Sequence, residues 1–108
     1  MTTNRLIAGA FLLCLAHTAA LGDEAQNKRG ETLLTRDCAR CHAVGRTGES
    51  PRKDAPAFRT LATRYPIDSL AEALGEGLVS GHPDMPEFEF DVADVGAIIA
   101  YLKSIQGR

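Results

Sequence analysis

The chain has 108 residues, a formal net charge of −2 at pH 7 and no tryptophan. This length allows a single domain with a small hydrophobic core. Because the chain is mildly acidic and has no stripe of basic residues, its composition argues against a nucleic-acid-binding protein.

The first 22 residues have the pattern of a secretory signal peptide. Arg5 gives a positive start, residues 6–16 form an apolar run, and Ala20-Leu21-Gly22 places small residues where a signal peptidase reads them. The run is shorter than the ~20 apolar residues of a membrane span, and an uncleaved anchor is the alternative interpretation. We therefore predict a signal peptide over 1–22, export to a bacterial periplasm, and a mature domain over 23–108.

After residue 22 the sequence alternates between helical and irregular patterns, and no segment has a strand pattern. Residues 44–56 and 81–90 are predicted loops, because the first is rich in Gly, Ser, Pro and charge and the second contains two prolines. Two helices are predicted over Ala25–Asp37 and Ala57–Arg64. A third is capped by Asp68 or Ser69 and continues through Leu74. A fourth begins at a capping box of Asp91 and Asp94 and ends near Ile105. The last helix carries aliphatic residues at the helical repeat, namely Val92, Val95, Ile98, Ile99, Leu102 and Ile105.

Cys38-Ala39-Arg40-Cys41-His42 forms a C-x-x-C-H motif, which is the attachment signature of a c-type haem. Two thiols at this spacing can each add to a haem vinyl group and form thioethers, and the histidine that follows is then the proximal iron ligand. One covalently bound haem c, held by Cys38, Cys41 and His42, is therefore the predicted cofactor. Such a group would also complete the core of the short mature domain, whose two cysteines both belong to the motif, so that none is left for a disulfide.

The motif has two other possible interpretations. A zinc half-site also uses C-x-x-C, but tetrahedral zinc needs four separated ligands, and adjacent Cys41 and His42 would form a cramped pair. A thioredoxin-like redox pair needs C-x-x-C inside a βαβ pattern, which this sequence lacks. The haem interpretation is favoured over both.

With these motifs in place, nearly the whole mature sequence resembles the class I cytochromes c. Gly30 stands where that family packs its first helix closely against its last, Leu34 where many members carry an aromatic residue, and Tyr101 where an aromatic residue covers the helix crossing. Pro56 matches the family proline whose carbonyl accepts a hydrogen bond from the proximal histidine, a contact that orients the ring. The resemblance implies an all-α class I cytochrome c fold of about four to five short helices around one covalently attached haem.

The same resemblance identifies Met85, which Pro86 follows, as the sixth iron ligand. A methionine that only fills core space is the simpler interpretation, but it fits an irregular, proline-rich segment badly. His82 is the rival ligand, because bis-histidine ligation also closes the iron and would lower its reduction potential. An open sixth position is the third possibility. The predicted metal ligands are thus His42 and Met85.

The sequence therefore predicts an exported monohaem c-type cytochrome that carries single electrons, and not an enzyme, since nothing in it resembles a substrate site. A dedicated haem subunit of a periplasmic oxidoreductase, and a sensor or peroxidase-like protein with an open iron site, are the alternatives. The resemblance implies a monomer of a respiratory chain. Its donor would be a quinol-oxidising complex or a dehydrogenase, and its acceptor an oxidase or a reductase. Charge is uneven, with nine basic and four acidic residues over 28–64 and two basic and eight acidic residues over 65–108, and such a field can steer a partner.

Overall fold

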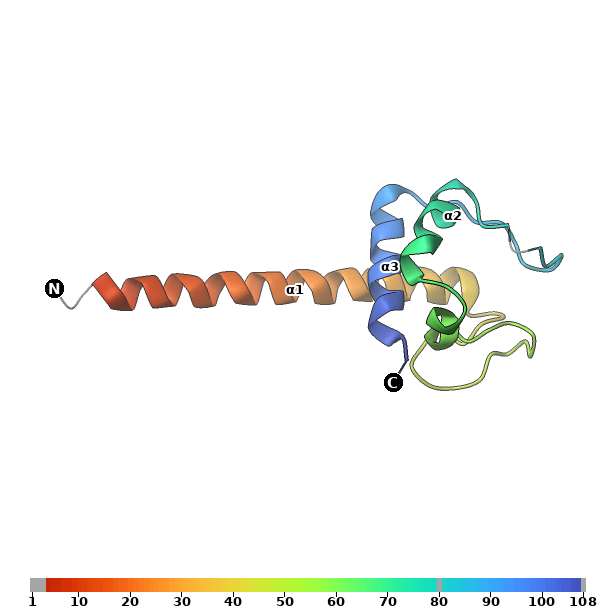
Figure 1. Ribbon diagram of the computed structural model, residues 1–108, viewed down its shortest axis with the longest axis horizontal. Coiled ribbons are helices and arrows are strands. Elements are labelled where there is room, and N and C mark those ends of the chain that lie inside the picture. Colours follow the sequence, from red (N-terminus) through yellow and green to blue (C-terminus); the bar gives the residue numbers. More distant parts are fainter. Residues whose placement is uncertain (1–3, 80, 108) are drawn as a thin grey trace.

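The computed structural model describes residues 4–79 and 81–107, with side chains from residue 21 onward. Within these residues the chain forms three α-helices and two 3₁₀-helices and no strand. In chain order the elements are α1 (Asn4–Cys38), η1 (Phe58–Thr63), η2 (Ile67–Ser69), α2 (Leu70–Glu76) and α3 (Val92–Ile105). The elements after α1 gather around its C-terminal part, while its N-terminal half extends beyond them (Figure 1).

Helix α1 is much longer than the helix predicted from Ala25 to Asp37. It begins at Asn4 and continues without interruption to Cys38. The segment before Ala25 contains no proline and is rich in Leu and Ala, which are strong helix formers, so nothing in it breaks the helix. The predicted end of the helix at the cysteine motif is confirmed, whereas its predicted start is wrong. No helix in the described residues has both the length and the apolarity that crossing a bilayer requires.

Helix α3 crosses the C-terminal part of α1 (Figure 1), and Gly30 lies at the point of closest approach to Ala97 and Tyr101. Gly30 is buried, and a Cβ added there would collide with the backbone carbonyl of Ala97 and come within 2.7 Å of the Tyr101 Cβ. Only a residue without a side chain allows the two backbones to approach this closely. The predicted role of Gly30 in the helix crossing is therefore confirmed.

The segment predicted as a helix from Ala57 to Arg64 is a 3₁₀-helix rather than an α-helix. The backbone N–H and the hydroxyl of Thr60 both donate to the Ala57 carbonyl, three residues earlier. The Thr63 hydroxyl bonds the Thr60 carbonyl in the same way. Short-range bonds from threonine side chains compete with the longer bonds of an α-helix, which accounts for the difference.

Helix α2 starts where Ser69 as the N-cap position predicts, and it ends later than the sequence predicts. Ile67–Ser69 forms η2, the Ser69 side chain makes no capping hydrogen bond, and α2 continues past Leu74 to Glu76. Gly75 lies inside the helix, and Gly77, with a φ of 109°, ends it. Gly77 adopts a positive φ that other residues rarely adopt, so it is the stronger helix terminator of the two glycines.

The start of α3 confirms one half of the predicted capping box. The Asp91 carboxylate accepts a hydrogen bond of 2.8 Å from the Asp94 backbone N–H, but the Asp94 carboxylate pairs with Arg29 on α1. Val92 is 90% exposed and does not belong to the core, although it fits the aliphatic repeat of α3. The buried core consists of Leu33, Leu34, Val44, Phe58, Leu61, Ile67, Leu74, Ile98, Ile99, Tyr101, Leu102 and Ile105.

Candidate haem site

The C-x-x-C-H motif begins in the last residue of α1 and continues as a tight turn. The backbone N–H groups of Cys41 and His42 both donate to the Cys38 carbonyl, at 3.2 and 3.0 Å. Both cysteines are half-buried free thiols. Burial, with smaller contributions from Asp37 and Cys41, raises the pKa of the Cys38 thiol to about 11. A redox-active C-x-x-C pair depends on a lowered thiol pKa, so this environment argues against the dithiol interpretation.

His42 is oriented by contacts on two sides. Its Nδ1 lies 2.8 Å from the Pro56 carbonyl oxygen, which can only accept, so Nδ1 is the protonated nitrogen and donates the bond. The imidazole also stacks on the buried ring of Phe58, with the ring centroids 4.7 Å apart. The predicted contact with Pro56 is confirmed. It leaves Nε2 as the nitrogen with a lone pair for a metal.

Several contacts that the sequence did not indicate fix the segment after the motif. The Ala43 N–H donates to the Ser50 hydroxyl at 3.0 Å, and the Arg52 N–H donates to the Cys41 carbonyl at 3.2 Å. The Tyr101 hydroxyl on α3 donates to the Val44 carbonyl at 2.9 Å. Together these bonds hold the loop that carries Pro56 beside the motif. Each of these bonds involves at least one backbone atom, which no residue pattern identifies.

Phe58 belongs to the predicted helix Ala57–Arg64, and no sequence pattern assigned it a role at the haem site. Its position two residues after Pro56 could have drawn attention to it, since a proline that contacts His42 also brings the residues that follow it close to the imidazole. The buried phenyl ring gives one face of that imidazole an apolar surface. An apolar environment of this kind influences the redox potential of a bound metal.

Met85 lies on the irregular segment between α2 and α3, which the two prolines were predicted to keep non-helical. Its side chain is half-buried and lines a surface pocket together with Leu78, Val79 and Pro83. The Met85 backbone N–H donates to the His82 carbonyl at 3.1 Å, which closes a turn around Pro83.

His82, the rival ligand, belongs to the same turn, is exposed and lines the same pocket as Met85. Its Nε2 lies 2.8 Å from the Asp54 carboxylate on the loop that precedes Pro56. The zinc interpretation gains no support from this region, since the described part of the chain contains no group of three or more His, Cys, Asp or Glu side chains arranged to hold a metal ion.

Comparison with known proteins agrees with this geometry. The family model described as Cytochrome c matches residues 27–106. The chain belongs to the cytochrome c family. It is also 32% identical over 96 residues to cytochrome c-552 of Bradyrhizobium diazoefficiens, an alignment that covers 89% of this chain and 90% of that protein. No solved structure gives a significant match.

Membership of the cytochrome c family confirms the predicted fold class, with one correction: α1 is a long helix rather than a short one. It supports a monohaem c-type electron carrier and implies covalently bound haem c. The structure fits such a group, because Cys38 and Cys41 are free on one turn and the unprotonated Nε2 of His42 remains available for iron.

Proposed function

We propose that this cytochrome c carries one electron at a time on a haem attached through Cys38 and Cys41 and ligated by His42 and Met85. When bound, the haem iron supplies the one-electron chemistry. The observation that carries the proposal is the hydrogen bond from His42 Nδ1 to the Pro56 carbonyl. This bond fixes the tautomer and the ring orientation of a ligating histidine and raises its basicity.

The contacts of His82 support Met85 as the sixth ligand. The imidazole of His82 is exposed and is bonded to the Asp54 carboxylate. To bind iron through Nε2, His82 would have to give up this contact, whereas Met85 has no such competing bond because a thioether is only a weak acceptor. A histidine with a thioether as the second ligand raises the reduction potential above that of a bis-histidine site. The proposal is therefore a carrier of the higher-potential kind.

We place this carrier in a bacterial periplasm, after removal of residues 1–22. The support is the sequence pattern at the N-terminus, together with the need for an exported compartment in which haem is attached. A monomer that meets a quinol-oxidising complex or a dehydrogenase on one side and an oxidase or a reductase on the other fits a surface that carries both charge signs. Exposed Arg40 within the motif and exposed Asp84 and Glu87 around Met85 provide such charges.

Absorption spectra of the haem-loaded protein test the ligation. The ferric form should show the weak long-wavelength band of sulfur-to-iron charge transfer, and the ferrous form should be low-spin and slow to bind carbon monoxide. Met85→Ala should remove the band, open the iron to carbon monoxide and lower the reduction potential, because the ligand that favours ferrous iron is gone.

His82→Ala is the matched control, since it alters the same turn and should leave the band in place. If His82→Ala abolishes the native spectrum instead, a low-potential bis-histidine carrier replaces this proposal. If the wild-type protein binds carbon monoxide readily, the carrier function gives way to a sensor or a peroxidase-like enzyme. A covalent mass of one haem per chain that survives denaturation, starting near Asp23, would support the attachment and the predicted cleavage.

A further inference from the structure

Two loops leave the helices on the same side, away from the N-terminal half of α1 (Figure 1). One is the motif loop, residues 43–57, and the other is the Met85 loop, residues 77–79 and 81–91. Backbone bonds close the base of the Met85 loop, from Phe90 N–H to the Leu74 carbonyl at 2.9 Å and from Leu78 N–H to the Phe88 carbonyl at 3.4 Å. The turn that carries Met85 lies beyond this base.

Charged side chains join the turn of the Met85 loop to the motif loop. The Asp84 carboxylate, next to Met85, lies 2.9 Å from a terminal nitrogen of the Arg52 guanidinium. His82 contacts Asp54 at 2.8 Å, and Asp54 in turn accepts a bond of 2.7 Å from the Arg52 Nε. Arg52 therefore reaches the turn directly through Asp84 and indirectly through Asp54.

Arg52 is also tied to the motif itself. Its backbone N–H donates to the Cys41 carbonyl at 3.2 Å, and its own carbonyl accepts from the Ala55 N–H at 3.1 Å. A continuous chain of contacts thus runs from Cys41, one of the two haem-attachment cysteines, through Arg52 to Asp84, the neighbour of Met85. A planar guanidinium can engage two carboxylates at once, which a lysine ammonium does less well.

We propose that Arg52 is a positioning residue that holds the turn of Met85 against the haem-attachment motif. This inference rests on the proposed function. It means that Arg52 slows the departure of the Met85 sulfur from iron without contacting the sulfur or the iron. The side chains are partly exposed, 37% for Arg52 and 62% for Asp84. Exposed ion pairs are individually weak, but pairs that share one guanidinium form a network. The expected effect is therefore a change in loop opening and not in global folding.

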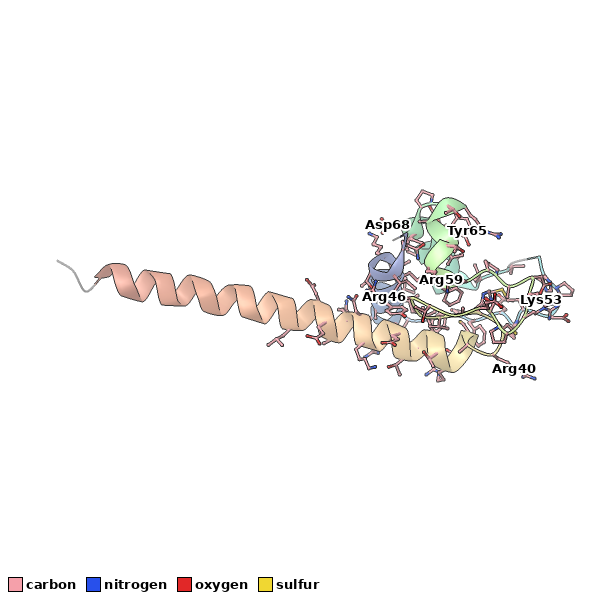
Figure 2. The ribbon with its side chains drawn as sticks, turned by 90° about the horizontal axis from the view of Figure 1, so that it is seen from below. Arg40, Arg46, Lys53, Arg59, Tyr65 and Asp68 are labelled. Carbon is pink, nitrogen blue, oxygen red and sulfur yellow. The ribbon has the colours of Figure 1, made fainter. Side chains whose placement is uncertain are left out.

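The rate at which neutral imidazole displaces Met85 from the ferric, haem-loaded protein measures this opening. Arg52→Gln should raise the rate by about three- to tenfold, the factor expected from losing two exposed contacts. Asp84→Asn should raise it by a smaller factor, and Arg52→Lys should restore part of the wild-type rate. Lys53→Gln is the matched control. It removes the same charge from the next residue along the same loop (Figure 2). Lys53 is exposed, and none of the contacts of this network in the described structure involves it.

Two further measurements separate positioning from a general loss of stability. Amide hydrogen exchange should accelerate over residues 82–88 in Arg52→Gln and stay unchanged in α3. In about 1 M salt, where the screening length falls to about 3 Å, the wild-type rate should approach that of Arg52→Gln, whose own rate should change little.

The positioning role would be overturned if Arg52→Gln and Lys53→Gln had equal rates of imidazole binding and equal amide exchange in the Met85 loop. In that case an intact sulfur-to-iron band in the wild type would still support the proposed ligation. A wild-type protein that lacks this band would overturn the ligation instead. The exchange rates of residues 82–88 would then still decide whether Arg52 holds the loop.

Discussion

Tyr101 connects the last helix to the segment that follows the haem-attachment motif. Its ring is buried at the crossing of α1 and α3, and its hydroxyl donates to the buried carbonyl of Val44. Burial raises the pKa of this phenol above its usual value of about 10, with a smaller contribution from Glu31. One side chain therefore fixes both the helix crossing and the position of the chain just after His42.

Tyr101→Phe keeps the ring but removes the hydroxyl, which leaves the buried Val44 carbonyl without its donor. We expect the free energy of unfolding of the haem-loaded protein to fall by about 1–2 kcal/mol, measured by denaturant titration. The exposed Tyr65 provides the control, and Tyr65→Phe should change that free energy by less than about 0.5 kcal/mol. Equal losses in the two variants would contradict the role of the hydroxyl bond.

The pH dependence of this variant has a definite sign. The pKa of Tyr101 in the folded protein is raised above the unfolded value of about 10. The contribution of the Tyr101 hydroxyl to the free energy of unfolding is therefore fully present below pH ~10. It is lost as the pH rises through the folded pKa. The stability difference between wild type and Tyr101→Phe should therefore narrow at strongly alkaline pH and be constant at neutral pH.

At the scale of single residues, the sequence identified the groups that define the chemistry and one group that orients them, and it missed the others. Cys38, Cys41 and His42 stand in a spacing that has few uses, and Pro56 could be placed by resemblance. Phe58 and Arg52 act through loop conformations that bring them beside the motif. No local pattern encodes a contact between side chains on two irregular loops, so the network around Arg52 could not be predicted.

At the scale of elements, the crossing of α1 and α3 depends on one glycine. Gly30 and Gly96 both lie inside α-helices, so replacing either by alanine should gain about 0.8–1 kcal/mol from helix propensity alone. A Cβ at Gly96 meets nothing closer than the Gln26 side chain at 4.0 Å, whereas a Cβ at Gly30 collides with the backbone of α3. The two substitutions differ only in the space that receives the methyl group.

Gly96→Ala should therefore raise the unfolding free energy by up to about 1 kcal/mol, while Gly30→Ala should lower it by about 1–3 kcal/mol through overpacking at the crossing. Thermal or denaturant unfolding of the haem-loaded variants measures both. If Gly30→Ala were stabilising, the two helices would have to be further apart than the structure places them.

The elements themselves were predicted with uneven success, for physical reasons. The repeat of aliphatic residues in α3 is long and regular, and the structure confirms its limits at Val92 and Ile105. The shorter helix before Tyr65 became 3₁₀ because threonine hydroxyls compete for its carbonyls. Helix α1 extends back to Asn4 because no helix breaker interrupts it. Its predicted start at Ala25 was wrong because an expected cleavage site says nothing about the conformation of the backbone around it.

At the scale of the whole molecule, the haem-attachment motif lies at the edge of a small core. Cys38 and Ala39 are partly buried and pack against the buried cluster that includes Leu34 and Phe58. Both cysteines of the motif are free, so no disulfide joins these positions. A domain this short rarely gains enough stability from its own apolar residues and usually depends on a covalent or metal-based constraint. The attached haem would supply that constraint from the end of α1.

Replacing both Cys38 and Cys41 by alanine should therefore leave a largely unfolded, haem-free chain with weak helical circular dichroism and fast amide exchange in α3. Arg40→Ala is the matched control, because Arg40 is an exposed residue of the same motif and its loss leaves both cysteines in place. That variant should keep covalent haem and the full helical signal. A haem-free double variant with complete helical dichroism and slow exchange in α3 would mean that the aliphatic cluster suffices to fold the chain. The haem would then serve electron transfer alone. The packing of α1 against α3 would have to account for the whole stability of the domain.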